Sequence, residues 1–220
     1  MSVAEILKQR VSTRAFMPKP VPKRILEEIL ALALQAPSNC NVQPWNVYVV
    51  SGQTCKNLGR ELVAVAGSGQ APNPDFPWQG VYEGALRERQ IGAAQALYGV
   101  LGIDRGDREA RKQAMLKNFE FFGAPHAMFF VMEKSLQING AVDLGIFAQT
   151  VALLMAERGI DSCLQGALGQ FPDPVHACLG IPKSQGVLFG MSFGYSDDSH
   201  PANAARTVRE PLDTLVRFVD

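Results

Sequence analysis

Two arginines and a serine alternate near the N-terminus, in the segment Arg10-Val-Ser12-Thr-Arg14. Alternate side chains of an extended segment lie on one side, so two guanidinium groups would flank a hydroxyl there. Arginine binds phosphate and carboxylate groups through its planar fork, and serine adds a short donor. This spacing favours a site for an anion with several oxygens, whereas a solvated basic turn at a helix end is the simpler alternative for the segment alone.

A second basic pair, Arg206 and Arg209, lies near the C-terminus in the segment NAARTVREPLD. Residues three apart are neighbours on a helical turn, so the two guanidinium groups can share a face. One of them would join the N-terminal arginines around the same anion only if the fold brings the two ends of the chain together. Otherwise the pair belongs to a surface turn.

A short polar loop, Ala36–Trp45, offers neutral groups to a ligand, and Pro37 and Pro44 restrict its backbone. Its amide and hydroxyl side chains can read the edge of a heterocycle, or they can form a turn that links a helix to a strand. These side chains belong to Ser38, Asn39, Asn41 and Gln43.

A third polar segment, LQGALG, contains Gln165, Gly166 and Gly169. Glycine has no side chain, so the backbone here can approach a flat ligand closely. The alternative is a bend at the end of a strand.

Cys40 has the most reactive side chain of the polar loop, yet the sequence provides no partner for it. A nucleophilic cysteine needs a base, and the histidines, at positions 126, 176 and 200, lie far away in the sequence. Neither the histidines nor the four cysteines show the spacing of a zinc site or a redox dithiol. We therefore expect no metal, no catalytic protein side chain and structural roles for His126 and His176. A hydrolase that uses Cys40 is the alternative.

Composition limits the classes of partner. The chain has 220 residues, with 21 basic and 21 acidic side chains, so no net field attracts nucleic acid or an anionic membrane. Four cysteines without a pairing pattern indicate reduced thiols in a cytoplasmic protein, and the N-terminus lacks the pattern of an export signal. The apolar tract Ile138–Met155 contains Asn139, Asp143, Gln149 and Thr150, which predicts a helix buried in the protein or an interface rather than a bilayer span.

The positions of apolar residues and prolines predict the elements that carry these segments. Helices are expected at 2–10, 22–34, 53–67, 83–101, 107–121, 141–159 and 173–180, with a helix or tail at 210–219. Buried strands are expected at 46–52, 126–133, 160–168 and 186–195. Residues 67–82 hold three prolines and predict a long irregular excursion, which in a compact domain is usually functional. The order predicts one α+β domain over residues 1–220, with about four strands surrounded by helices and the helical region 83–121 near the active site.

Several of these segments resemble, in order, the motifs of the FMN-dependent nitroreductase family over almost the whole chain. RVSTRAF resembles the family's Arg-x-Ser-x-Arg/Lys-x-Phe element, and APSNCNVQPWNVYVV resembles its Pro-Ser-x-x-Asn-x-Gln-Pro-Trp element. FFGAPHAMFFVME, DLGIFAQTVALLMAERGIDSCLQGAL, LGIP and FGYSDDSHPANAARTVREPLD follow in the family's order. The irregular excursion and the run NFEFFGAP are most similar to the branch that includes nitrobenzoate-type reductases.

The resemblance implies a mostly antiparallel sheet, a homodimer with two sites at the interface, and one FMN in each site. It implies that the phosphate and the ribityl or pyrimidine side are held by Arg10, Ser12, Arg14 and Arg209, with Arg206 as a helper. The partner subunit would supply Pro37, Ser38, Asn39 and Asn41. Near the flavin N5 edge would lie Gln165 and Gly166. The chain departs from common family residues at Gln165, where several members have Glu, and at Thr207, where members often have Lys.

The resemblance also implies a ping-pong reaction in which NADPH or NADH reduces the flavin and a nitroaromatic, quinone or similar acceptor reoxidises it. Arg14 is the candidate to stabilise the reduced flavin. The aromatics of the excursion, Phe76, Trp78 and Tyr82, are expected over the substrate face. A second trio, Phe119, Phe121 and Phe122, is expected in the core. The alternatives are a specialised enzyme of the same fold, a dehalogenase or a flavin-modifying enzyme, and a flavin-binding protein without significant turnover.

Overall fold

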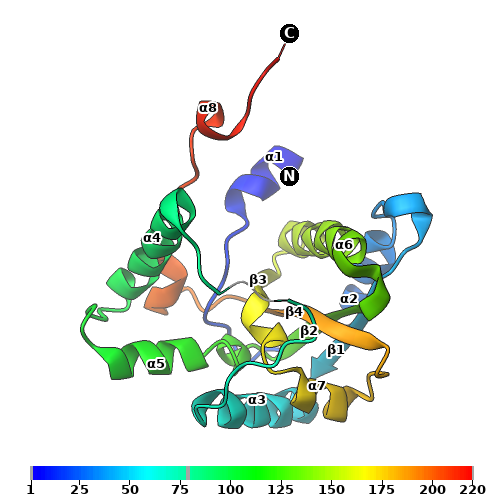
Figure 1. The fold of residues 1–220 in the computed structure, drawn as a ribbon, viewed down its shortest axis with the longest axis horizontal. Coiled ribbons are helices and arrows are strands. Elements are labelled where there is room, and N and C mark those ends of the chain that lie inside the picture. The colour runs from blue at the N-terminus through cyan, green and yellow to red at the C-terminus, as the bar shows by residue number, and fades with distance from the viewer. Residues whose placement is uncertain (1, 78–79, 220) are drawn as a thin grey trace.

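A four-stranded sheet forms the centre of the computed structural model, which describes residues 2–77 and 80–219 (Figure 1). Its strands are β1 (Asn46–Ser51), β2 (His126–Glu133), β3 (Asp161–Gln165) and β4 (Gln185–Gly194). They lie in the order β1-β2-β4-β3, and each neighbouring pair is antiparallel. The prediction of an α+β fold around an antiparallel sheet is therefore confirmed.

Helices cover both faces of this sheet (Figure 1). One face packs against α2 (Lys23–Ala33) and α6 (Gln137–Glu157), and the other against α3 (Gly52–Gly67) and α7 (Pro172–Leu179). The remaining helices are α1 (Val3–Gln9), α4 (Gly84–Val100), α5 (Arg108–Leu116) and the single turn α8 (Leu212–Leu215). Strand β2 is buried on both sides, since Met128 and Phe130 face α6 while Ala127 and Phe129 face α3.

Two local predictions were wrong. Strand β1 lies at an edge of the sheet, and of its six residues only Val50 is buried. Helix α5 ends at Leu116 instead of continuing to Phe121. Residues Phe121 and Phe122 adopt φ of +55° and +54° in a tight turn, a backbone conformation that bulky residues rarely take. Both rings are buried there, so packing of the aromatic side chains overrides the helical periodicity.

Helix α6 is long and apolar enough, together with the turn before it, to cross a membrane by length and composition alone. Its polar residues therefore do not by themselves exclude a bilayer span. The core helix of a water-soluble domain passes the same test, and α6 buries Leu144, Phe147 and Val151 against the sheet and α2. This packing agrees with the expected buried helix.

The irregular excursion after α3 has no helix or strand in its described residues, as the prolines predict. Of its aromatics, Trp78 lies outside the described residues. The excursion returns toward the sheet at Asn73, whose backbone N–H donates to the Gln170 carbonyl at 3.0 Å.

His126 fixes the N-terminal loop to the sheet and gives the fold a pH dependence. Its Nε2 accepts the Val21 N–H at 2.8 Å, so the ring proton lies on Nδ1 and is donated to Ser51 Oγ at 2.6 Å. Burial lowers the pKa of His126 below its ordinary value of 6.5. As the pH falls below 6.5 the unfolded chain binds a proton before the folded chain does, so stability is lost between 6.5 and the lower folded-state pKa.

We therefore expect the thermal unfolding midpoint of the wild type to fall between pH 7 and pH 5, and part of this fall to disappear in His126→Gln. Differential scanning fluorimetry of both proteins across that range measures the difference. Equal pH slopes for the two proteins would contradict the assignment to His126.

Candidate active site

The N-terminal arginine segment lies along the edge strand β3. Ser12 pairs with Ser162 in a parallel bridge, and the Thr13 N–H donates to the Ser162 carbonyl at 3.1 Å. Thr13 and Ala15 are buried, whereas Arg10, Ser12 and Arg14 are partly exposed. This alternation agrees with the expected arrangement, in which Arg10, Ser12 and Arg14 lie on the other side of the segment.

The thiol of Cys163 in β3 marks where these three residues converge. Burial raises the pKa of Cys163, while the charges of Arg14 and Arg10 and a hydrogen bond with Ser12 act in the opposite direction. The thiol therefore stays uncharged and does not neutralise the guanidinium groups. The described residues contain no ion pair that involves Arg10, Arg14, Arg206 or Arg209, which leaves their charges available to an anion.

The side chain of Asn203 joins the two ends of the chain. Its Oδ1 accepts the Arg14 N–H at 2.7 Å, and its Nδ2 donates to the Ala15 carbonyl at 2.8 Å. Arg206 follows directly and donates to the Asn203 carbonyl at 2.7 Å. The fold thus brings the C-terminal segment of Arg206 next to the N-terminal segment, which was the condition for a shared anion site.

Arg209 lies farther along the same C-terminal segment. With Arg206 it lines a cavity of about 710 Å³ between α4 and this segment. Its guanidinium donates to Thr207 Oγ1 at 2.9 Å, so Thr207, where relatives of the expected family often have Lys, orients the arginine.

The polar loop has a strained backbone. Cys40, Asn41 and Gln43 have φ of +48°, +55° and +48°, which costs free energy in residues other than glycine and is typical of functional sites. A buried carboxylate on α6 holds the loop, since Asp143 Oδ1 accepts the Asn39 N–H at 3.0 Å. The loop is therefore built to present a fixed polar surface.

Within one chain this loop does not lie beside the arginines. Figure 1 shows the loop after α2 on one side of α6 and the segment after α1 on the other. Asn39 and Asn41 are exposed, while Pro37 and Ser38 lie beside them at the start of the loop. A single chain thus brings together the arginines and the Gln165 segment, but not the residues 37–41.

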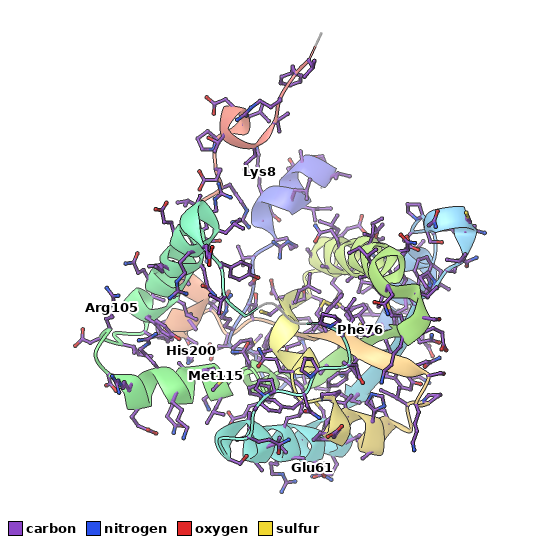
Figure 2. The ribbon with its side chains drawn as sticks, viewed as in Figure 1. Lys8, Glu61, Phe76, Arg105, Met115 and His200 are labelled. Carbon is purple, nitrogen blue, oxygen red and sulfur yellow. The ribbon has the colours of Figure 1, made fainter. Side chains whose placement is uncertain are left out.

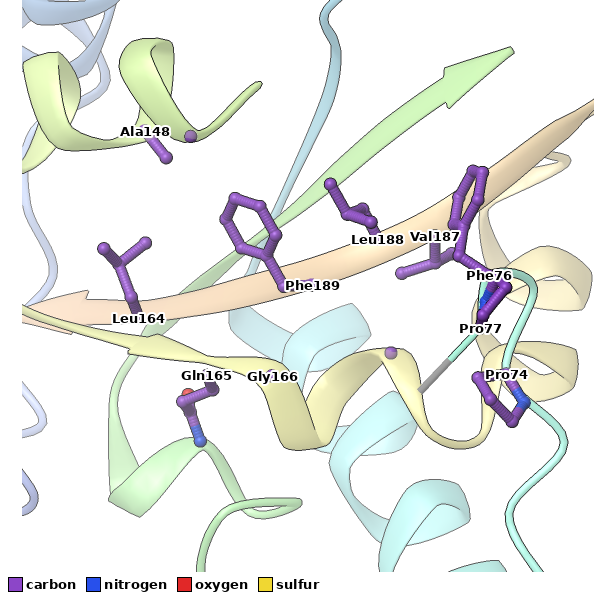
Figure 3. A pocket seen from close by; sticks show the side chains of 12 residues that line it. Pro74, Phe76, Pro77, Ala148, Leu164, Gln165, Gly166, Val187, Leu188 and Phe189 are labelled. Atoms are coloured by element: carbon purple, nitrogen blue, oxygen red, sulfur yellow. The ribbon is translucent and has the colours of Figure 1, made fainter. Parts of the chain in front are cut away.

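A mostly apolar pocket of about 390 Å³ opens at the end of β3 (Figure 3). Its floor comes from Leu164, Gly166 and Phe189, and α6 contributes Gly145 and Ala148. Phe76 and Pro77 of the excursion form another wall beside β4 (Figures 2 and 3). A planar apolar molecule therefore finds walls on several sides next to Gly166.

The side chain of Gln165 forms hydrogen bonds within the protein. It is buried, its Oε1 accepts from the Ser192 hydroxyl, and its Nε2 donates to the Asn118 carbonyl at 2.9 Å and to Asn118 Oδ1 at 3.3 Å. Figure 3 shows it pointing away from the aromatic and aliphatic side chains of the pocket. Gln165 thus offers the pocket mainly its backbone. Sequence reasoning missed Asn118, because its partner Gln165 lies 47 residues away in the chain.

The other predicted aromatic side chains lie either in the core or at the surface. Phe119, Phe121 and Phe122 are buried in the core, which confirms their expected role. Tyr82 is exposed and does not line the pocket of Phe76.

The histidines are engaged away from Cys40. His126 bonds Val21 and Ser51, His176 bonds Asp75, and His200 accepts from the Ala202 N–H. The Cys40 thiol is exposed and donates to Asn39 Oδ1 at 3.6 Å. This arrangement gives no support to a cysteine-dependent hydrolase.

Comparisons with known proteins agree with this geometry. The family model described as "Nitroreductase family" matches residues 7–195. Nitroreductase NfnB of Mycolicibacterium smegmatis is 37% identical over 97% of this chain and 91% of its own length. A 4-nitrobenzoate reductase of Nocardioides sp. is 32% identical over 97% of this chain and 88% of its own.

Solved structures extend the likeness to three dimensions. The crystal structure of the FMN-dependent nitroreductase NfnB from Mycobacterium smegmatis in complex with NADPH superposes with a TM-score of 0.94 at 37% identity, covering 99% of this chain and 98% of that one. An FMN- and NADPH-dependent nitroreductase NfnB from a Sphingopyxis strain gives 0.94 at 30% identity and full coverage of both chains. By sequence and by fold, the chain belongs to the nitroreductase family.

Proposed function

We propose that this chain is an FMN-dependent NAD(P)H oxidoreductase that reduces nitroaromatics, quinones or similar small acceptors. The observation that carries the proposal is the full-length likeness to FMN- and NADPH-dependent nitroreductases, at 30% and 37% identity. The 4-nitrobenzoate reductases among its relatives support an aromatic nitro compound as the acceptor.

The residues present fit an anionic planar cofactor. Two arginines and a serine converge beside an uncharged thiol, and no carboxylate among the described residues pairs with the arginines. We assign Arg10 and Ser12 to the phosphate and ribityl side, with Arg209 and Arg206 as further cations, and Arg14 to the pyrimidine side. Gly166 and the backbone of Gln165 would border the reacting edge.

The cofactor, when bound, supplies the hydride chemistry. The protein then has to bind, orient and exclude water. A guanidinium at Arg14 favours negative charge on the ring system, and the apolar walls from Leu164, Phe189 and Phe76 exclude water from an aromatic acceptor. No protein nucleophile is required for this task.

We also propose a homodimer in which the partner subunit supplies residues 37–41. Helix α6 carries an exposed apolar stripe at intervals of four residues, Ile138, Val142 and Ile146, with exposed fractions of 72, 55 and 39%. The last described residues of the chain are also apolar and exposed; they are Leu212, Leu215, Val216, Phe218 and Val219. Surfaces of this kind mark protein interfaces, and a second copy would bring the polar loop to the arginines.

The remaining proposals concern organisation. Both core clusters share the central sheet, which supports a single domain over residues 1–220. The balanced charge and the four free thiols support a cytoplasmic protein without a nucleic-acid or membrane partner.

Anaerobic titration of the FMN-saturated protein tests the function. We expect NADPH or NADH to bleach the oxidised flavin band and a nitroaromatic or quinone to restore it, at similar rates in the wild type and in Cys40→Ser. Bleaching without reoxidation by any acceptor would favour a flavin-binding protein or a narrower activity, such as dehalogenation. A protein that neither nicotinamide bleaches, or a loss of turnover in Cys40→Ser with flavin retained, would overturn the proposal.

A further inference from the structure

A single carboxylate, that of Asp75, fastens the irregular excursion to three separate elements. Its Oδ1 pairs with Lys134 Nζ at 2.7 Å, next to the end of β2. Its Oδ2 accepts from His176 Nε2 of α7 at 2.7 Å and from the Val187 N–H of β4 at 2.9 Å. The side chain is only 10% exposed, so the Asp75 carboxylate is largely shielded from water, and its three partners can all donate to it.

The imidazole ring of His176 contacts both Asp75 and the backbone of Ile181. His176 Nδ1 lies 3.3 Å from the Ile181 carbonyl, while Nε2 faces the Asp75 carboxylate. The contact of Nε2 with the carboxylate, at 2.7 Å, is the shorter of the two. The cluster thus places the Asp75 carboxylate between the Lys134 ammonium and the His176 imidazole at the edge of β4.

The same cluster closes around an edge that the sheet leaves open. Strand β3 ends at Gln165, opposite Gly190, so the residues of β4 before Gly190 have no neighbour from β3. The Val187 N–H on this free edge is the one that Asp75 accepts. The excursion thus caps the part of β4 that β3 does not cover.

The excursion packs closely against the backbone of Gly186. A Cβ on Gly186 would lie 2.7 Å from Asp75 Cβ and 2.8 Å from Phe76 Cε2, both shorter than real contacts. Asn73 adds a hydrogen bond from its Nδ2 to Asp173 Oδ2 at 2.8 Å. The segment 73–77 therefore has a fixed position, although it contains no helix or strand.

The fixed segment carries a wall of the pocket beside Gly166. Phe76 follows Asp75 directly, and Phe76 and Pro77 line the pocket opposite Ala148 of α6 (Figure 3). We propose that Asp75, held by Lys134 and His176, is a positioning residue that sets Phe76 as the wall against which a planar aromatic acceptor packs. The inference rests on the proposed function, because it assigns the acceptor to this pocket.

Hydrogen exchange and steady-state kinetics together test the proposal. We expect Asp75→Ala to speed exchange of the Val187 amide and of the segment 73–77, and to raise the KM for a two-ring nitroaromatic by about 10-fold with kcat changed less than about 3-fold. Asp75→Asn keeps the shape of the side chain and loses its charge, so an intermediate effect is expected. The affinity for FMN should be the same in all variants.

Two further variants distinguish the role of Asp75 from that of Phe76. Phe76→Ala should raise the same KM while the Val187 amide stays protected, because Asp75 remains in place. Asp104→Asn changes an exposed aspartate outside this pocket and should alter neither measurement. If Asp75→Ala unfolds, Asp75→Asn carries the test.

Each outcome decides the inference. Unchanged exchange at Val187 in both Asp75 variants would show that Asp75 does not hold the segment, and faster exchange with an unchanged KM would show that the segment does not shape the acceptor site. Either result overturns the proposal. A wild type that binds FMN without turnover would refute the proposed function instead. The exchange measurements would still test whether Asp75 holds the segment 73–77, since they need no activity.

Discussion

Arg10→Ala is expected to weaken FMN binding by about 10- to 100-fold, the effect of losing one or two charge-assisted hydrogen bonds to a phosphate. The charge of Arg10 acts on the uncharged thiol of Cys163, and no carboxylate of the described residues pairs with it. Its contribution therefore goes to the ligand rather than to the fold. The dissociation constant is measured by quenching of flavin fluorescence, together with the flavin retained after desalting.

Arg10→Lys and Arg24→Ala are the matched controls. The lysine keeps the charge and loses the fork, so it should bind FMN with intermediate affinity. Arg24 is 81% exposed and pairs with Glu28 on the surface of α2, and its removal should leave FMN binding unchanged. Equal affinities for the wild type and Arg10→Ala would refute the assigned phosphate site.

Mixed dimers extend this test to the partner's loop. If residues 37–41 reach the site of the other subunit, a dimer of one Arg10→Ala chain and one Asn41→Ala chain has one intact site and one doubly altered site. Such a dimer, isolated with two affinity tags, should bind close to one tight FMN per dimer. If the loop served its own chain, each site would carry one substitution and no tight site would remain.

Gln165→Ala is expected to lower the free energy of unfolding by about 2–4 kcal/mol, because it leaves the buried Ser192 hydroxyl without its acceptor and opens a cavity. The Ser192 hydroxyl and the Asn118 carbonyl would both lose the amide that now bonds them. For a chain of this size the midpoint should fall by roughly 4–16 °C. Thermal unfolding of the FMN-free protein measures the change.

Gln165→Glu separates hydrogen bonding from volume. The carboxylate can still accept from Ser192, but it would face the two acceptor oxygens of Asn118 without a donor. The loss should be large at pH 7.5 and smaller at pH 5, where a protonated carboxyl can donate again. Gln53→Ala, which removes an exposed amide bonded to Asn57 on α3, should change the midpoint little. A Gln165→Ala midpoint within 1–2 °C of the wild type would contradict this account.

Local patterns predicted most of the fold because they reflect local physics. Alternate burial along the segment 12–15, the capping of α1 by Ser2 and the irregular excursion all follow from residue type and spacing. The edge position of β1 could not be read in the same way, because NVYVV is apolar enough for a central strand and only the strand order exposes it. The early end of α5 is similar, since buried phenylalanines impose the turn.

Some residues of the candidate site could be predicted from local sequence patterns, and others could not. The arginines, the polar loop and Gly166 were found from their types and from a family resemblance, and the structure brings Arg10, Ser12 and Arg14 to one strand edge. The roles of Asn118 and Asp75 depend on partners 47 and about 100 residues away, Gln165 and His176. Nothing in a local pattern encodes such pairs.

The hydrogen bonds of Asn203 bear on the stage of chain synthesis at which the site can form. It links residue 203 to residues 14 and 15, across 189 and 188 positions of the chain. During synthesis the N-terminal arginines leave the ribosome long before the segment that completes their surroundings. We therefore expect the cofactor to bind only after the C-terminal segment has been made. A nascent or C-terminally truncated chain would then lack the stabilisation that a bound ligand adds.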